Sequence, residues 1–418
     1  MNQGKRFRLV HGAKNAAIYD LESGKVYSIN ASGKQIIQNY LSENSNFADK
    51  EKAYLEQLHN LGITMDTIED DSKHEPYEIE SDNCLVYAWL ELTEKCNCNC
   101  IHCYGQWGDA EKNAHKGLSK EYWISILDEI YRRGGRDVQL IGGEPLLHED
   151  FADILRHAHQ IGMQRIDVFT NATLIDEKMA QLLKESGASV RVSLYGHCAE
   201  LHEKVTQRAG SFSKTEHGLK ILKSYEIPTK IAVVVMDVNE NHISDIRAYI
   251  ESLELEYNGY DTIRQAVGGN QISHCVDRLD VLSVRYQRES CFKTTEDAFN
   301  KNHCINTCWY RKLAFAATGD VYPCIFARDF KIGNIKEDSF DEIFNKAQVP
   351  WTYSLDYVDD CKECEFRYAC RDCRPLAQSL TGNPNGKFPR CTYNPQEGIW
   401  KKVEDVTVEL KVIPLIKD

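Results

Sequence analysis

The sequence predicts an α/β protein: a partial (β/α)6 TIM-like barrel, preceded by a winged-helix-like α+β domain and followed by a cysteine-rich domain. Two observations favour this fold class. Strand-like runs alternate with helical runs through the middle of the chain, and cysteines crowd the chain from about residue 291 onward. Alternating strands and helices are typical of a parallel sheet with helical crossovers. We therefore predict that residues 85–290 curl into part of a barrel.

The first 70 residues have the pattern of a small separate domain. Two alternating runs, 16–20 and 25–29, are joined by Glu22-Ser23-Gly24, which favours a hairpin, and residues 7–10 supply a third strand. Asn30 or Ser32 is expected to cap a first helix, and a second helix is expected to end at Gly62. The chain is then acidic from residue 66 to 83, and we predict a linker over residues 71–84.

Six strand-like runs define the predicted barrel. They cover residues 87–92, 137–141, 165–170, 189–194, 229–235 and 260–265. Between the first two, Trp123, Leu127 and Ile130 recur at helical spacing after a capping Ser119, and Phe151, Ile154 and Leu155 do the same in the next interval. Residues 291–400 form the predicted cysteine-rich domain, and residues 401–418 a C-terminal strand and tail with clean alternation from 406 to 412.

Composition limits the function. The 418 residues carry a formal charge of −13, which disfavours binding to nucleic acid or to anionic membranes. The N-terminus has no apolar signal segment, and no run reaches the roughly 18 apolar residues that span a bilayer. We expect a soluble, cytoplasmic protein without a nucleic-acid or membrane partner. Sixteen cysteines in a reducing compartment indicate metal or catalytic chemistry.

A three-cysteine loop follows the first predicted barrel strand. Cys96, Cys100 and Cys103 have the spacing C-x3-C-x2-C, and the loop stands at the C-terminal end of a strand, where enzymes of this architecture keep their active sites. Three such thiolates can hold three corners of a cubane iron-sulfur cluster and leave one iron open. A zinc knuckle or an inert cysteine cluster is the alternative for the triplet alone.

The loop resembles the signature of the radical S-adenosylmethionine (radical SAM) superfamily, and the resemblance extends over most of residues 84–400. Gly142-Gly143-Glu144-Pro145 follows the second strand, as the family's GGEP motif does, although such a tetrapeptide alone is more often a plain turn. In the family this motif meets the amino group of S-adenosylmethionine. By position, the further candidates for contact with this cofactor are Tyr104, Asn171, Ser193 and Arg208; packing or surface exposure is the alternative for each.

This resemblance also implies a mechanism. The open iron binds the amino and carboxylate groups of S-adenosylmethionine, an electron cleaves the sulfonium, and a 5'-deoxyadenosyl radical abstracts a hydrogen from the substrate. The protein positions the reactants and excludes side reactions. The sequence does not identify a catalytic general base.

The C-terminal cysteines resemble a SPASM domain, the module that carries two auxiliary four-iron clusters in a subfamily of radical SAM enzymes. The chain departs from that pattern by placing two residues, where the family usually has three, between its last close pair. The resemblance assigns an outer cluster to Cys361, Cys364, Cys370 and Cys391, and a cluster nearer the barrel to Cys308, Cys324 and Cys373 with Cys304. Cys291 is a rival to Cys304, and three ligands would leave an open iron. Two zinc sites are the alternative.

Residues 1–70 resemble the PqqD-like peptide-recognition domain of enzymes that mature ribosomally made peptides. The resemblance implies that a leader peptide binds as an added strand, with a purely structural or relic domain as the alternative. We therefore predict a radical SAM oxidoreductase with three 4Fe-4S clusters, S-adenosylmethionine, a precursor peptide and a one-electron reductant such as flavodoxin or ferredoxin. The predicted product is a thioether cross-link. The alternatives are a carbon-carbon or cyclophane cross-link, sulfatase maturation, or a noncatalytic electron carrier or peptide chaperone.

Overall fold

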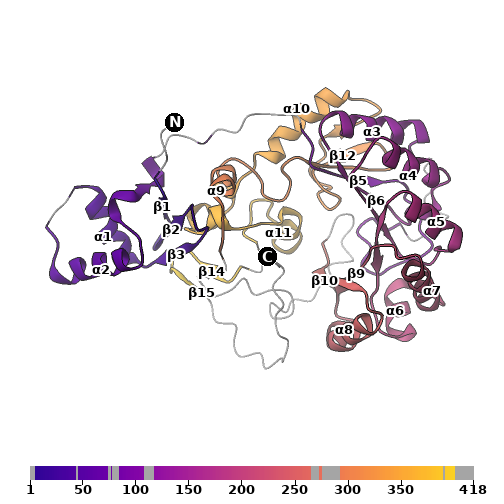
Figure 1. Cartoon of the computed structure of the whole chain (residues 1–418), viewed down its shortest axis with the longest axis horizontal. Coiled ribbons are helices and arrows are strands. Elements are labelled where there is room, and N and C mark those ends of the chain that lie inside the picture. The colour runs from indigo at the N-terminus through magenta and orange to yellow at the C-terminus, as the bar shows by residue number, and fades with distance from the viewer. Residues whose placement is uncertain are drawn as a thin grey trace. The chain divides into compact units, whose positions relative to one another are not determined.

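The computed structural model describes residues 5–43, 46–73, 77, 84–107, 117–264, 273–274, 292–388 and 391–400 (Figure 1). The chain divides into two compact units. The first combines Met1–Ser81, Val284–Tyr310 and Thr352–Thr407, and the second combines Asp82–Ser283, Arg311–Trp351 and Val408–Asp418. The N-terminal segment therefore shares a unit with most of the predicted cysteine-rich domain. The predicted strand and tail at 401–418 lie outside the described residues, as do Cys275 and Cys291.

The first unit begins with a four-stranded sheet in the order β3-β2-β1-β4. Its strands are β1 (Phe7–His11), β2 (Ala16–Asp20), β3 (Val26–Ile29) and β4 (Ile68–Asp70). Two helices follow β3, α1 (Ala31–Leu41) and α2 (Asp49–Asn60), and the Asn30 side chain caps α1 by accepting from the Gly33 N–H at 2.8 Å. The hairpin and both helices are confirmed. Phe7 also pairs in parallel with Ile68, which adds a fourth strand just before the predicted linker.

Both faces of this sheet are buried. One face packs on α1 and α2 through a core that includes Leu9, Ile18 and Ile37. The other face presents Val10, Ala17 and Tyr19 to aromatic side chains from much later in the chain. Every residue of β2 is buried, as expected for a strand covered on both sides.

The later part of the first unit has little regular structure. It contains α9 (Glu296–Asn302), α11 (Arg374–Thr381), three 3-10 turns (Leu355–Tyr357, Cys361–Glu363 and Arg367–Ala369) and the hairpin of β14 (Tyr393–Asn394) with β15 (Ile399–Trp400). Phe366, Tyr368 and Tyr393 are the aromatic side chains that meet the N-terminal sheet. This segment therefore depends on the N-terminal residues for its core.

The second unit contains a nine-stranded sheet in the order β10-β9-β8-β7-β6-β5-β11-β12-β13. Six parallel strands form its predicted part: β5 (Tyr87–Glu91), β6 (Asp137–Ile141), β7 (Arg165–Thr170), β8 (Ser189–Ser193), β9 (Thr229–Val235) and β10 (Glu256–Thr262). The connecting helices are α3 (Lys120–Arg132), α4 (Phe151–Gln160), α5 (Glu177–Glu185), α6 (Ala199–Thr206), α7 (Ser211–Ser224) and α8 (Ile243–Ser252). The predicted strand-helix units are confirmed, except that the last strand begins at Glu256 and not at Tyr260.

Three strands extend the barrel sheet beyond the prediction. Strand β11 (Lys312–Phe315) pairs in parallel with β5, and β12 (Asp320–Tyr322) and β13 (Gly333–Asn334) follow it antiparallel. The helix α10 (Phe340–Trp351) packs beside them through Ile343 and Phe344, which are fully buried. Residues 311–351 of the predicted cysteine-rich domain thus extend the barrel.

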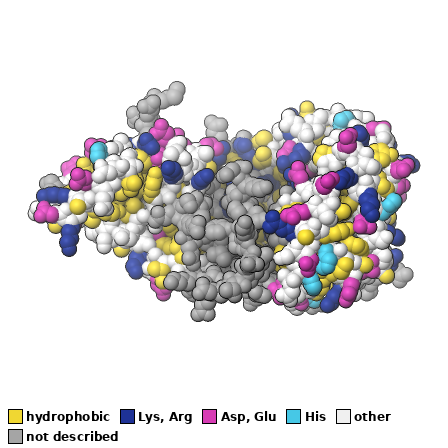
Figure 2. Space-filling model, turned by 60° about the horizontal axis from the view of Figure 1, so that its bottom comes forward, with side chains coloured by type: hydrophobic (Ala, Val, Ile, Leu, Met, Phe, Trp, Pro, Cys, Tyr) yellow, Lys and Arg dark blue, Asp and Glu magenta, His cyan; other side chains and the backbone are white. Residues whose placement is uncertain are grey.

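Charged side chains of both signs are present on the surface. In Figure 2, Lys and Arg side chains are interspersed with Asp and Glu side chains over the described parts of the face shown. Among the described residues, no helix combines the length and the apolar character needed to cross a membrane.

Candidate active site

A cavity of about 810 Å³ opens among the barrel strands of the second unit. Cys96, Cys100 and Cys103 line it together with residues from each of the strands β5 to β10. Its volume lies in the range of known small-molecule and cofactor sites. The structure therefore brings the three predicted cluster ligands together at one cavity.

The GGEP motif fastens the cysteine loop. The Gly143 N–H donates to the Thr93 carbonyl at 2.7 Å, and the Glu144 N–H donates to the Lys95 carbonyl at 2.8 Å. A Cβ atom on Gly143 would stand 2.2 Å from the Lys95 carbonyl oxygen, and one on Gly142, whose φ is +152°, would stand 2.4 Å from that of Thr93. Glycine is therefore required at both positions because two backbone segments touch there.

Glu144 is fully buried and follows the two glycines that line the cavity. Its carboxylate accepts hydrogen bonds from the Thr170 hydroxyl at 2.7 Å, the Asn171 N–H at 2.9 Å and the Leu146 N–H at 3.2 Å. Burial raises the pKa of Glu144 to about 7, against the opposing effect of these three donors. Gly142 and Gly143 are among the described residues that line the cavity, whereas Glu144 and Pro145 are not. The carboxylate thus ties the end of β6 to the end of β7.

Asn171 lines the cavity and joins two loops. Its amide donates to the Asn97 side chain at 2.7 Å, and its side-chain oxygen accepts from the Thr173 hydroxyl at 2.6 Å. Asn97 in turn donates to Thr173 at 2.8 Å. Sequence reasoning missed Asn97 and Thr173, although the position of Asn97 inside the cysteine loop was a usable signal. This triangle fixes the loop against the end of β7.

Two further predicted contacts differ in placement. Ser193, at the end of β8, lines the cavity. Arg208 is exposed and is not among the described residues that line it, although its charge lowers the pKa of Cys98, which burial raises overall to about 11. Arg208 therefore influences Cys98 through its charge and does not line the cavity in this structure.

Tyr104 lines the cavity inside an aromatic group. Its hydroxyl donates to the Glu91 carboxylate at 2.8 Å, and its ring packs edge-on against Trp107 and Phe326, with centroids 4.9 Å and 5.1 Å away. Glu91 also pairs with the Arg328 guanidinium, and burial raises the pKa of Tyr104 well above its usual value. Sequence reasoning missed Glu91 and Arg328, which are 237 positions apart.

The cavity thiols fit a bound metal cluster better than they fit free thiolates. Burial raises the pKa of Cys96 to about 12, and burial with the neighbouring thiols raises the pKa of Cys100 well above its usual value. The thiols of Cys96 and Cys100 therefore resist ionisation unless a cation neutralises them, and metal coordination removes the thiol proton. The loop can therefore hold an iron-sulfur cluster.

The outer set of cysteines also converges. Cys361 and Cys364 begin and follow one 3-10 turn, where the Cys364 N–H donates to the Cys361 carbonyl at 2.9 Å. Burial is the main cause that raises the pKa of Cys361, and the neighbouring Cys370 and Cys391 raise it further. Burial also raises the pKa of Cys364, and Cys370 and Cys361 contribute to this rise. The four predicted ligands of the outer cluster therefore lie within electrostatic reach of one another.

The predicted ligands of the other cluster are divided between the two units in the chain. Cys304, Cys308 and Cys373 belong to the first unit, and Cys324 belongs to the second. The Cys304 thiol donates to the Tyr77 carbonyl at 2.9 Å, and burial raises its pKa. Its rival Cys291 lies outside the described residues.

Comparisons with known proteins agree with this geometry. Residues 90–250 match the radical SAM superfamily, and residues 304–374 match SPASM, an iron-sulfur cluster-binding domain. An AdoMet-dependent heme synthase of Oleidesulfovibrio alaskensis is 25% identical over 75% of this chain and 88% of its own length. The antilisterial bacteriocin subtilosin biosynthesis protein AlbA of Bacillus subtilis is 24% identical over 77% and 73%.

The fold has a counterpart among solved structures. The crystal structure of Streptococcus suis SuiB bound to S-adenosylmethionine superimposes with a TM-score of 0.57 at 14% identity, over 93% of this chain and 97% of that one. The chain therefore contains a radical SAM domain and a SPASM domain, and it is an enzyme with the radical SAM fold. A radical SAM domain implies a 4Fe-4S cluster and S-adenosylmethionine, and a SPASM domain suggests auxiliary iron-sulfur clusters.

Proposed function

We propose that this enzyme oxidatively modifies a ribosomally made precursor peptide and forms a thioether between a cysteine sulfur and a carbon of another residue. The N-terminal sheet carries the proposal, since the edge strand of a four-stranded sheet can hold an extended peptide as an added strand. The similarity to AlbA, named for subtilosin biosynthesis, supports a peptide substrate.

The radical site is proposed at the cavity. Cys96, Cys100 and Cys103 would hold a 4Fe-4S cluster, with Tyr104, Asn171 and Ser193 toward S-adenosylmethionine. When bound, these groups supply a 5'-deoxyadenosyl radical that removes a hydrogen from the substrate. The chain's own part is to position the cysteine loop, through Gly143, Glu144 and Asn97, and to exclude water by the aromatic wall around Tyr104.

The leader peptide is proposed to add to the edge of β3. That strand pairs with β2 through Ile18 and Tyr27, which leaves its other side as the outer edge of the sheet. Among the described residues, one isolated antiparallel bridge lies near this edge. It joins Lys25, the residue before β3, to Lys293. The opposite edge, β4, is shorter, with three residues. An added strand on β3 would gain main-chain hydrogen bonds at little conformational cost.

The proposed thioether forms by an oxidation that removes two hydrogens from the peptide. A carbon-hydrogen bond and a sulfur-hydrogen bond of the peptide are replaced by one carbon-sulfur bond. One hydrogen atom goes to the 5'-deoxyadenosyl group, the thiol gives up a proton, and one electron leaves the product. Two auxiliary 4Fe-4S clusters, held by the outer set and by Cys308, Cys324 and Cys373 with Cys304, are the proposed electron acceptors. A flavodoxin or ferredoxin is proposed to supply the reducing electron.

Mass spectrometry tests this proposal. Anaerobic holoenzyme with S-adenosylmethionine, dithionite and the short peptide encoded beside its gene should give a product lighter by two hydrogens, with one thiol fewer available to iodoacetamide. A product lighter by two hydrogens that keeps all its thiols would establish a carbon-carbon or cyclophane link instead. Cleavage of S-adenosylmethionine without a changed peptide would contradict the peptide proposal.

A second candidate is an oxidative reaction on a substrate that is not a precursor peptide. The similarity to the heme synthase favours it, since that relative is matched over most of its length. Hydrogen-deuterium exchange separates the two candidates. The leader peptide should slow exchange in residues 26–29 and leave residues 68–70 unchanged, whereas unchanged exchange in both edges would favour the second candidate.

A further inference from the structure

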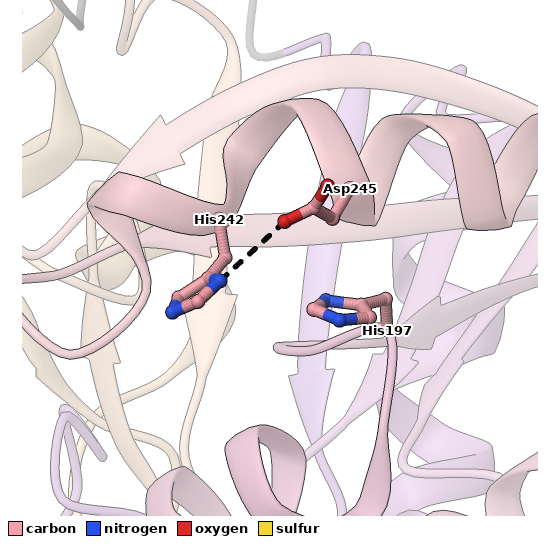
Figure 3. A group of neighbouring side chains, drawn as sticks. All are labelled: His197, His242 and Asp245. Carbon is pink, nitrogen blue, oxygen red and sulfur yellow. Dashed lines mark ion pairs between the residues drawn. The ribbon is translucent and has the colours of Figure 1, made fainter.

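A second metal-ligating group lies apart from the cysteines, in the barrel unit. It consists of His197, His242 and Asp245, whose ligand atoms all lie within 4.8 Å of one another (Figure 3). His197 stands in the segment between β8 and α6, His242 occupies the N-cap position of α8, and Asp245 lies in the first turn of α8. Strands β8 and β9 are parallel neighbours, so the segments that follow them emerge at the same edge of the sheet.

We propose that His197, His242 and Asp245 form a binding site for one Zn²⁺ ion. Two imidazole nitrogens and a carboxylate oxygen are a donor set that zinc accepts, and a water molecule would complete the tetrahedron. Ligand atoms in such a site lie roughly 3.3 Å apart. The His242 Nδ1 and Asp245 Oδ2 atoms are already 3.5 Å apart, and all three ligand atoms lie within 4.8 Å of one another. The side chains of His242 and Asp245 are about half exposed, so small rotations can bring both toward His197.

The buried nitrogen of His197 points to a missing partner. Its Nδ1 atom is buried and has no hydrogen-bond partner among the described residues. A buried polar atom without a partner loses its interaction with water and gains nothing in return. Its ring centroid lies 5.8 Å from that of His242, which suits two imidazoles that share one ion. A plain surface ion pair between His242 and Asp245 would leave His197 unexplained.

Zinc at this place would fasten a wall of the cavity. The segment that carries His197 also carries Tyr195, which lines the cavity. Asn239 already links the two segments by donating to the Tyr195 carbonyl at 3.1 Å and to the Val234 carbonyl at 3.0 Å. A metal bridge from His197 to α8 would add a second link between the same two segments. We therefore assign the ion a positioning role at the cavity rim.

Equilibrium dialysis of the anaerobic holoenzyme against buffered free Zn²⁺ tests the site. Wild-type protein should retain one zinc per chain, and His197→Ala and His242→Ala should each lower the affinity for zinc by about tenfold or more. The matched control is His157→Ala, since His157 pairs with Asp128 at 2.7 Å as an ordinary surface pair. Equal zinc retention by all four proteins would overturn the proposal, because zinc would then be elsewhere.

X-ray absorption at the zinc edge decides the matter without any variant. The proposed site predicts nitrogen and oxygen neighbours with an imidazole pattern and no sulfur. A sulfur shell would place the zinc on cysteines and refute the assignment. If an alanine variant fails to fold, Asp245→Asn at the exposed third ligand should lower zinc retention, and unchanged retention there would also count against the site.

Discussion

The two cysteine sets that the structure describes most fully are held in different ways. Cys96, Cys100 and Cys103 lie on a loop next to a parallel sheet. Hydrogen bonds from the segments that follow β6 and β7 hold this loop in place. The outer set, Cys361 to Cys391, sits among 3-10 turns and short strands, packed on the N-terminal sheet. The barrel therefore has its own apolar framework, whereas the segment of the outer set takes its apolar core from the N-terminal sheet. Loss of metal should affect the two regions differently.

The largest expected effect is at the barrel loop. Replacing Cys96, Cys100 and Cys103 by Ala should abolish cleavage of S-adenosylmethionine and remove about four of roughly twelve irons, because the loop would hold one of three cubane clusters. The barrel should remain folded, since its sheet does not depend on that cluster. Iron analysis, a cleavage assay and circular dichroism measure these outcomes. Cys84→Ala is the control, and a triple variant with unchanged iron would contradict the assignment of the loop.

The glycine that touches the loop gives the next effect. Gly143→Ala should lower cleavage of S-adenosylmethionine by about tenfold or more, since the new Cβ would stand 2.2 Å from the Lys95 carbonyl oxygen and displace the cysteine loop. Gly117→Ala is the matched control, because its nearest neighbour would be at an ordinary 3.7 Å. Equal activity of the two variants would show that the loop tolerates displacement.

The dependence of the outer set on the N-terminal sheet can be broken at β2. Tyr19 is fully buried, packs against Phe299 and donates to the Glu365 carbonyl at 2.8 Å. Tyr19→Ala should destabilise the first unit by about 3–5 kcal/mol and lower its iron content. Ile18→Ala on the opposite face of β2 should destabilise the helical side without loss of outer iron. Denaturant unfolding and iron analysis under anaerobic conditions distinguish the two.

The same packing changes what a truncation means. Deleting residues 1–70 would expose Phe366, Tyr368 and Tyr393 along with removing any peptide site. Loss of peptide modification in such a truncation would not separate recognition from stability. A fully stable outer cluster in the truncated protein would contradict the dependence inferred from the packing.

The smallest expected effect is a pH dependence of the barrel unit. Burial lowers the pKa of His202 to about 4, and the His202 Nδ1 atom accepts from the Tyr195 N–H at 3.3 Å. The unfolded chain binds a proton near pH 6.5 and the folded chain does not, so stability is lost as the pH falls from about 6.5 toward 4. Between pH 7 and 5 the loss should be about 2 kcal/mol.

Thermal unfolding of the His202→Phe variant at several pH values measures how much His202 contributes to the pH dependence of stability. The variant should show a flatter dependence of stability on pH over that interval, whatever its absolute stability. His59→Phe, on the exposed face of α2, is the control. A wild-type slope retained in His202→Phe would assign the pH dependence to other groups.

The sequence alone determined the periodic elements and the cysteine sets. Strand and helix periodicity found β6, β7 and β9 to the residue, because each strand has buried apolar residues at alternate positions, such as Ile166 and Val168 in β7. Cysteine spacing found the barrel loop, since three nearby thiolates are a local arrangement. The strand Ile68–Asp70 escaped because three residues of mixed polarity carry no period, and its partner Phe7 is 61 positions away.

Only the tertiary structure decided what surrounds these motifs. It showed that the GGEP glycines leave room for the backbone of the cysteine loop and that the Glu144 carboxylate accepts hydrogen bonds from the end of β7. It also showed that Arg328 forms an ion pair with Glu91. It also brought His197 beside His242 and paired the N-terminal sheet with the outer cysteines. These are contacts between segments far apart in the chain, and no local pattern records them, because their energy comes from packing that exists only once the chain has folded.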